Sequence, residues 1–326
     1  MILPALVSTA GLGVLGYNYL SGRNLVADSW DQFKLVTQPL EYWEEIWRHR
    51  PPTRIVACLT TIPSRLPYLE LTLKSLLYQN WAVAKIRLHL PEYSQREQAP
   101  YVVPEHLRNR DWLEIVTCPD YGPATKLIPA VLDLPSDQRI LVVDDDMLYP
   151  ASLTQHLLSY SQRYDDWVIC SSGWVVPDDL VDRPTTLWDN LRQKPPVPVK
   201  CTRVREPYPI DIVQGYSGFL TSPVFYDRAR LTDYSQAPDA CRWVDDVWLS
   251  AQCIVPKAVV PAPRYCFERW KMRKMMKAGS LGRKNRGDGN PLTRNNTIAI
   301  RHLRENWLNA LPGGSLEQKP NPLGHS

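Results

Sequence analysis

Residues 141–150 read LVVDDDMLYP and place three consecutive carboxylates, Asp144, Asp145 and Asp146, directly after an apolar run. Burying a carboxylate costs several kcal/mol unless a cation pairs with it, and neighbouring like charges add to that cost. We therefore expect positive charge close to these three side chains.

The apolar run itself indicates a strand. RILVV (139–143) is short, rich in β-branched residues and preceded by the loop-like LPSDQ (134–138), which predicts a buried strand. The acids then lie at its carboxyl end, the edge at which open α/β sheets bind ligands. On extended backbone, oxygens of the alternate residues Asp144 and Asp146 can converge on one divalent ion. A solvated turn after a strand is the alternative interpretation.

Composition describes a globular chain with one basic segment. The 326 residues are 44% hydrophobic and 22% charged with a net charge of +4, which argues against wholesale disorder. Nine Lys or Arg residues lie between Arg264 and Arg286, against the single acid Glu268. The seven cysteines include no C-x-x-C pair, so we expect no zinc framework but small buried thiols, which fits a reducing compartment.

The amino terminus is apolar. Residues 2–20 carry no charge and are about long enough to cross a bilayer as a helix, so residues 1–22 are expected to be a hydrophobic membrane anchor. No basic segment precedes the run, which favours an anchor over a cleaved signal. Arg23 and Lys34 follow it, which favours a cytoplasmic catalytic part. A hydrophobic helix packed on the protein itself is the alternative.

Beyond this segment the spacing of apolar residues changes twice. Residues 23–52 are expected to be a stem or linker, ending in a helix over PLEYWEEIWRHRPP (39–52). From residue 53 a strand (54–63), a helix (67–79) and a second strand (85–91) form a βαβ unit, which predicts a parallel sheet. Further strands are expected within 113–119, 139–143 and 167–174. We assign 53–268 to the core domain and 269–326 to a basic lid loop, a C-terminal helix and a tail.

Five segments in order resemble family 2-like glycosyltransferases of the GT-A fold. They are IVACLTTIPSRLPYLELTLKSLLYQNW (55–81), YGPATKL (121–127), LVVDDDMLY (141–149), QGYSGFL (214–220) and WVDDVWLSAQC (243–253). The resemblance implies an α/β fold of GT-A type, with a Rossmann-like, mostly parallel central sheet flanked by helices. It also implies a metal-dependent, inverting transfer of a sugar from a nucleoside diphosphate sugar to a hydroxyl of a glycan, polysaccharide or glycolipid.

The resemblance assigns roles to the acids after the strand. Asp146 would contact Mn2+ or Mg2+, Asp144 the metal or the ribose, and Asp145 would shape the turn on the donor side. A metal ion would neutralise the leaving diphosphate. His302, in IAIRHLRENW (298–307), matches the position of a third metal ligand, although a lone histidine is more often structural.

A second acidic pair, Asp245 and Asp246, opens an apparent helix, where N-capping alone would explain one acid. By the resemblance Asp246 would be the catalytic base. The family commonly has Glu where this chain has Asp245, so the choice between the two acids stays open.

The remaining candidates lie on the donor side. Lys126 follows a tight turn and could meet a phosphate or a sugar hydroxyl. Thr61, Ser64 and Arg65 end the first strand, where the nucleotide would lie. Gly215 and Gly218 would let the backbone approach the donor closely, or would serve as ordinary turn residues.

The basic segment 264–286 suggests either a lid over the diphosphate or contact with anionic lipid headgroups. Nucleic acid is not expected, because the segment has no motif for it. Two rival functions remain: a haloacid dehalogenase-type phosphatase with Asp144 as its nucleophile, and a sugar-binding module without catalysis.

Overall fold

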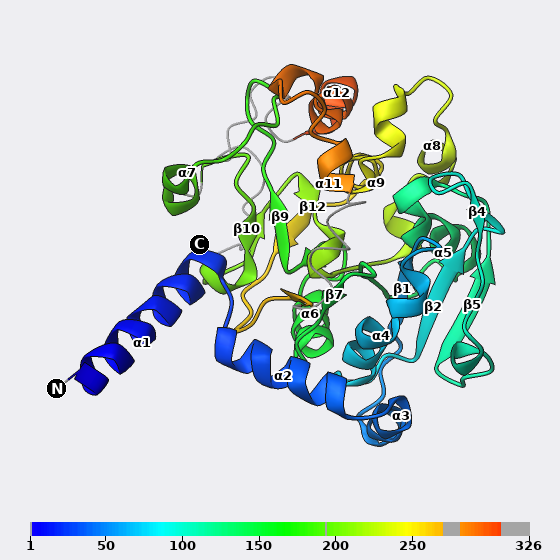
Figure 1. Ribbon diagram of the computed structural model, residues 1–326. Coiled ribbons are helices and arrows are strands. Elements are labelled where there is room, and N and C mark those ends of the chain that lie inside the picture. Colours follow the sequence, from blue (N-terminus) through cyan, green and yellow to red (C-terminus); the bar gives the residue numbers. More distant parts are fainter. Residues whose placement is uncertain (1, 193, 270–280, 308–326) are drawn as a thin grey trace.

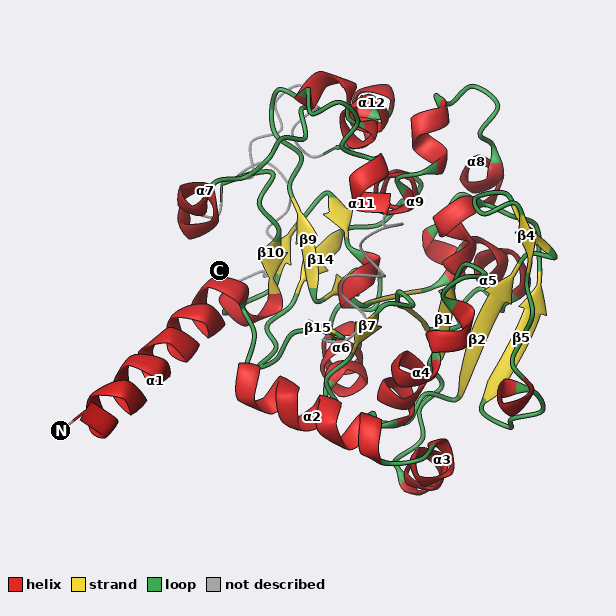
Figure 2. Ribbon diagram, viewed as in Figure 1, coloured by secondary structure: helices red, strands yellow, loops and turns green. Residues whose placement is uncertain are grey.

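The computed structural model describes residues 2–192, 194–269 and 281–307. A central eight-stranded sheet with helices around it forms the body of the molecule (Figures 1 and 2). The basic segment 264–286 is therefore described only in part, and its residues 270–280 lie outside the described residues, as do residues 308–326 of the predicted tail.

The sheet is mostly parallel, as predicted. Its strands, in spatial order, are β11 (Tyr208–Pro209), β14 (Lys257–Val259), β8 (Val168–Cys170), β13 (Phe219–Thr221), β6 (Ile140–Val142), β1 (Val56–Thr60), β2 (Lys85–Leu90) and β5 (Leu113–Thr117). β1 pairs in parallel with β2 and β6, while β13 runs antiparallel between β6 and β8. This α/β arrangement fits the expected GT-A type.

Three small sheets accompany the central one. They are β10 (Val199–Lys200) with β9 (Ser172–Trp174) and β12 (Ile212–Val213), β15 (Phe267–Glu268) with β7 (Met147–Leu148), and β3 (Tyr93–Ser94) with β4 (Ala99–Pro100). The β7–β15 pair brings the start of the basic segment directly behind the acids that follow β6.

The helices begin and end as follows: α1 (Ile2–Ser21), α2 (Leu25–Thr37), α3 (Leu40–His49), α4 (Glu70–Leu77), α5 (Ile128–Asp133), α6 (Leu153–Ser161), α7 (Leu187–Arg192), α8 (Arg228–Thr232), α9 (Asp245–Ala251), α11 (Leu281–Lys284) and α12 (Asn295–His302). α2 and α3 pack against α4, and α5 packs against α8.

The predicted βαβ unit is confirmed in β1, α4 and β2. The leucines expected on one face of α4, which are Leu69, Leu73, Leu76 and Leu77, are all buried. In α3 the predicted stem helix buries Leu40 and Trp43, and the indole N–H of Trp47 donates to the Val83 carbonyl at 2.8 Å. Apolar spacing thus decided which face of each helix meets the core.

The N-terminal helix forms where it was expected, but the predicted membrane span needs correction. Of the helices that the structure describes, none is long and apolar enough to cross a membrane. The reason lies in its composition, since α1 includes Ser8, Thr9 and Asn18 together with three glycines. α1 projects from the body of the molecule, and α2 lies along its lower side in Figure 1.

All seven cysteines carry free thiols. Cys58 and Cys170 lie in the buried strands β1 and β8. Burial raises the pKa of the Cys58 thiol to about 12, so this side chain acts as a small apolar group.

Candidate active site

A cavity of about 680 Å³ lies at the carboxyl ends of β1 and β6. This is the edge predicted from the strand that precedes the acids, and the volume suits a ligand of nucleotide size. Of the predicted site residues, the cavity is lined by Thr61, Arg65, Lys126, Asp144, Asp145, Asp146 and Asp245.

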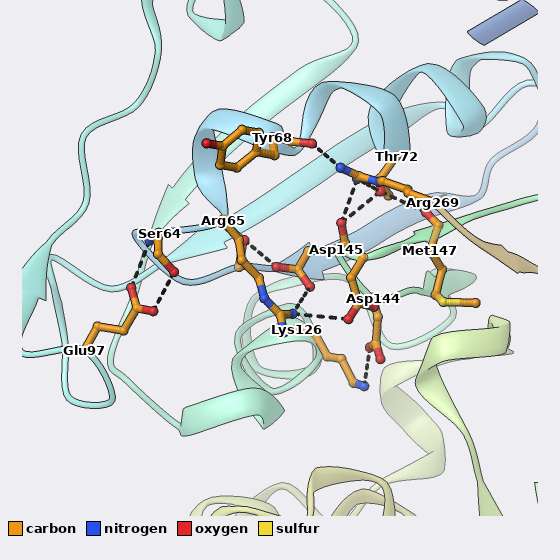
Figure 3. Close-up of polar contacts among 12 residues, drawn as sticks. Ser64, Arg65, Tyr68, Thr72, Glu97, Lys126, Asp144, Asp145, Met147 and Arg269 are labelled. Carbon is orange, nitrogen blue, oxygen red and sulfur yellow. Dashed lines mark hydrogen bonds and ion pairs between the residues drawn. The ribbon is translucent and has the colours of Figure 1, made fainter. Parts of the chain in front are cut away.

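Asp145 is the buried centre of the acid triplet. Its carboxylate accepts hydrogen bonds from the Thr61 hydroxyl and, at 2.9 Å, from Nη1 of Arg65 (Figure 3). Its backbone carbonyl accepts from Thr72 at 2.9 Å and from Nη2 of Arg269 at 2.9 Å. With its oxygens used inside the protein, Asp145 shapes the turn that presents its two neighbours to the cavity.

Asp144 and Asp146 face the cavity, with 30% and 31% of their side-chain surface exposed. Each already has a cation of the protein as its partner: Nζ of Lys126 lies 2.7 Å from Asp144 Oδ1, and Nη1 of Arg65 lies 3.3 Å from Asp146 Oδ2. The positive charge expected beside the triplet is thus supplied, at least in part, by side chains.

Lys126 is buried among carboxylates. It ends the 3₁₀ turn Gly122–Lys126, and its Nζ lies 2.7 Å from Asp144, 2.6 Å from Asp245 and 3.4 Å from Asp246. Burial alone would lower the pKa of this ammonium group, but the three carboxylates together raise it well above its usual value. Lys126 therefore stays charged and joins the two acidic pairs.

Gly215 allows this close packing. A Cβ on Gly215 would lie 2.1 Å from Nζ of Lys126 and 3.1 Å from Oδ1 of Asp144, so no larger residue fits without displacing the lysine. Gly218 serves a different purpose. It has φ +85°, lies against Leu153 of α6 and does not line the cavity, which favours the alternative of an ordinary turn residue.

The second acidic pair opens α9, as predicted, but does not cap it. Val244 is the N-cap residue, and neither carboxylate makes a capping bond. Oδ1 of Asp246 instead accepts from the Gly215 N–H at 3.0 Å. Burial in the enclosed site, followed by the charges of Asp245 and Asp144, raises the pKa of Asp246 to about 7 despite Lys126. Asp246 does not itself line the cavity, but it lies beside Asp245, which does, and its pKa lets it exchange a proton near neutral pH.

The acid triplet fits a divalent cation in chemistry and in charge. Two hard carboxylate ligands face the cavity. Burial, followed by the charges of Asp145 and Asp144, raises the pKa of Asp146 to about 7, so a cation bound beside it would favour its ionised form. A cation held by two carboxylates would take its other ligands from a bound phosphate or water.

His302 is not part of this set. It ends α12 with an exposed side chain, and the structure does not bring it to Asp144 and Asp146. In the described ranges, no group of three or more His, Cys, Asp or Glu side chains is arranged to hold a metal ion. The motif matched His302 by order in the chain, which does not determine where α12 packs.

Ser64 also lies elsewhere. Its side chain is exposed, and its backbone N–H and hydroxyl donate to the Glu97 carboxylate at 2.9 and 2.6 Å (Figure 3). Ser64 does not line the cavity, because this residue fixes the loop after β1 to the loop after β3.

Four cations of the cavity were missed as site residues from the sequence: Arg23, Arg96, Lys200 and Arg269. Burial, together with the nearby charge of Arg65, lowers the pKa of Arg96. Arg96 lies in the loop after β3, not far beyond the carboxyl end of β2. The sequence could have indicated this position, because ligands bind at the carboxyl ends of parallel strands. Lys200 and Arg269 come from β10 and from the residue after β15, and only the folded chain brings them here.

No protein-family model and no curated protein matches this chain. Similar solved structures include GalNAc-T7 with UDP, GalNAc and Mn2+, at 12% identity and a TM-score of 0.41, over 68% of this chain and 43% of that one. The match thus spans less than half of that protein.

Two further structures are similar at the same level. The mannosyltransferase PcManGT from Pyrobaculum calidifontis, in complex with GDP-Man and Mn2+, is 14% identical with a TM-score of 0.39, over 94% of this chain and 86% of that one. The enzyme 4-diphosphocytidyl-2C-methyl-D-erythritol synthase is 10% identical with a TM-score of 0.39, over 70% and 97%. A mannosyltransferase is therefore among the proteins that this chain resembles in structure.

Proposed function

We propose that this protein is a glycosyltransferase that moves a sugar from a nucleoside diphosphate sugar to a hydroxyl acceptor on a glycan, polysaccharide or glycolipid. The observation that carries the proposal is an opposition of charges in one cavity. Asp144 and Asp146 face the same cavity that Arg65 and Arg96 line, so acids and guanidinium groups lie side by side there. A diphosphate with a bound divalent cation would bring positive charge to the acids and negative charge to the arginines.

On the donor side, Arg65 and Arg96 would bind phosphoryl oxygens, which guanidinium groups contact in a bidentate manner. Asp144 and Asp146 would hold Mn2+ or Mg2+, which, when bound, neutralises the charge that develops on the leaving diphosphate. Lys126 keeps Asp144 in place and preserves positive charge near the reacting centre.

On the acceptor side, Asp246 would take the proton of the attacking hydroxyl. The acceptor oxygen forms a bond to the anomeric carbon as the bond from that carbon to the diphosphate breaks, and the proton passes to a carboxylate oxygen of Asp246. A pKa of about 7 suits a general base at neutral pH. One direct displacement predicts inversion, so an α-linked donor would give a β-linked product.

The two rival functions have less support. A phosphatase would use Asp144 as nucleophile, but Oδ1 of this carboxylate pairs with Lys126, and the complete unit β1–α4–β2 precedes the strand of the acids. A sugar-binding module would need neither the buried cation cluster nor an acid with a pKa near neutrality.

Calorimetric titration with UDP, GDP and dTDP, each with and without Mn2+, tests the proposal. We expect one nucleoside diphosphate to bind and Mn2+ to tighten its binding. The matching nucleotide sugars are then screened for release of the sugar. Failure of all three nucleotides to bind with Mn2+ would contradict the proposal. Binding without turnover would favour the binding module, and hydrolysis of a simple phosphate ester would favour the phosphatase.

A further inference from the structure

Helix α2 buries Leu35 as an ordinary surface helix would, but it also buries its acids and exposes most of its large apolar side chains. Its acids Asp28 and Asp31 are buried, with 3% and 5% of their surface exposed. Its apolar side chains Val26, Trp30 and Phe33 are 69%, 60% and 57% exposed. A helix of a globular protein normally buries its apolar face, so this exposed face requires an explanation.

Ion pairs determine this orientation. Arg264 reaches α2 from the far end of the chain, with Nη2 at 2.8 Å from Asp28 and Nη1 at 2.5 Å from Asp31. Lys34 adds a bond of 2.9 Å to Asp31. These contacts hold the acidic face against the body. The apolar residues, spaced three or four apart, must then face outward, where the rings of Trp30 and Phe33 stack with centroids 5.8 Å apart.

The end of α1 is fixed beside this face. The carbonyls at the end of a helix have no partners within it. Here Arg203 donates to the Tyr19 carbonyl at 2.9 Å, Lys200 to that of Ser21 at 2.7 Å, and Thr202 to that of Gly22 at 3.1 Å. Leu12, Leu15 and Tyr19 of α1 are exposed as well. Both helices therefore carry exposed apolar side chains, and together we call these the α1–α2 surface: Leu12, Leu15, Tyr19, Leu20, Val26, Trp30, Phe33 and Val36.

The charge of this surface points to its partner. Between residues 11 and 37 the acids are Asp28 and Asp31, both buried, so no acidic side chain is exposed there. The cations Arg23 and Lys34 are partly exposed. Apolar and aromatic side chains bordered by cations, without exposed acids, are the composition that binds the interface of an anionic bilayer.

We propose that the α1–α2 surface docks on the headgroup layer of an anionic lipid bilayer without spanning it. Tyr17, Ser21 and Arg23 line the cavity as well, so docking would hold its mouth at the lipid surface. The proposal is independent of the proposed catalysis.

Flotation of the full-length protein with vesicles tests the proposal in the absence of nucleotide. The vesicles are phosphatidylcholine alone or phosphatidylcholine mixed with phosphatidylserine. We expect wild type to float with the mixed vesicles and less with the neutral ones. Replacement of Trp30 and Phe33 by Ser should lower the partition coefficient on the order of tenfold or more, because the two rings that would insert into the lipid interface are lost.

Matched variants separate the surface from general hydrophobicity. The double variant Val102→Ser/Ile254→Ser removes two exposed apolar side chains elsewhere and should float like wild type. Val26→Asp, a second variant at an exposed position, should also lower binding because it adds negative charge. Unchanged melting temperatures would show that each variant folds.

Two results would overturn the proposal. One is equal flotation of wild type and Trp30→Ser/Phe33→Ser. The other is a wild-type dimer in sedimentation velocity that this double variant dissociates, without vesicle binding, which would make a second copy of the chain the partner. Nucleotide titration of the same samples reports on the proposed catalysis separately.

Discussion

Nζ of Lys126 lies 2.7 Å from Oδ1 of Asp144, and the same nitrogen reaches Asp245 at 2.6 Å and Asp246 at 3.4 Å. The acid that follows β6 and the pair that opens α9 therefore share one cation. In the proposed reaction, the donor side and the acceptor side are coupled through this lysine.

Removal of that shared charge should shift the pH dependence of transfer. In Lys126→Met, the pKa of Asp246 should rise further above about 7, because its main source of positive charge is gone. The base is active when deprotonated, so the rise of rate with pH should move upward by about one unit or more. The measurement is the pH–rate profile. Lys85→Met, at a surface lysine, serves as the control and should keep the wild-type profile.

Wild type itself should lose activity as the pH falls. Burial places the pKa of Asp246 at about 7, so the rate should rise through neutrality and level off above it. At two pH units below that pKa, about one hundredth of the base remains deprotonated. Transfer measured at saturating donor checks this, since it isolates the bound state. A flat profile from pH 5 to 8 would contradict the assignment of the base.

Asp246→Asn should separate binding from chemistry. The variant should bind nucleotide and Mn2+ nearly normally, because the base does not contact the diphosphate, and should lose about 10²- to 10⁴-fold in transfer rate. Calorimetry gives the affinity, and NMR gives the anomer of the product. Asp245→Asn is the matched partner. If it is inactive while Asp246→Asn turns over, the base is Asp245, and retention of the anomer would rule out direct inversion.

Asp146→Asn should abolish metal-dependent nucleotide binding and leave the fold intact. An amide oxygen is a poorer ligand for a hard cation than a carboxylate. The test compares nucleotide affinity with and without Mn2+. The exposed Asp166→Asn controls for the loss of one negative charge and should bind as wild type does. Retained Mn2+ dependence in Asp146→Asn would remove Asp146 from the proposed metal site.

Gly215→Ala should damage the site from within. The added Cβ would lie 2.1 Å from Nζ of Lys126, so the ammonium group must leave its three carboxylates or the backbone must shift. We expect a loss of about 1–3 kcal/mol in the free energy of unfolding and a marked loss of transfer. Thermal melts and rate assays measure both. Gly13→Ala, which has no neighbour within 4 Å and lies inside helix α1, should keep the wild-type rate and should not lower stability.

Local pattern was sufficient for the elements that build the site. β-branched runs, leucine spacing and the position of the acids predicted β1, α4, β2, β6 and the start of α9, and with them the edge where Asp144 and Asp246 meet. These signals are local because side-chain periodicity follows from the geometry of each element. The motifs of the resemblance likewise selected Thr61, Arg65 and Lys126, and all three line the cavity.

Tertiary structure alone decided which partner each charge has. Lys126 and Arg65 pair with acids of the triplet. Ser64 donates a hydrogen bond to Glu97, and His302 does not line the cavity of the acids. Helix α2 is the clearest case, because it exposes the apolar side chains of Val26 and Trp30. Arg264, more than 200 residues away in the chain, binds Asp28 and Asp31 and turns the apolar face outward. Such ion pairs depend on which distant segments the folded chain brings together. A local sequence pattern does not determine which distant segments these are.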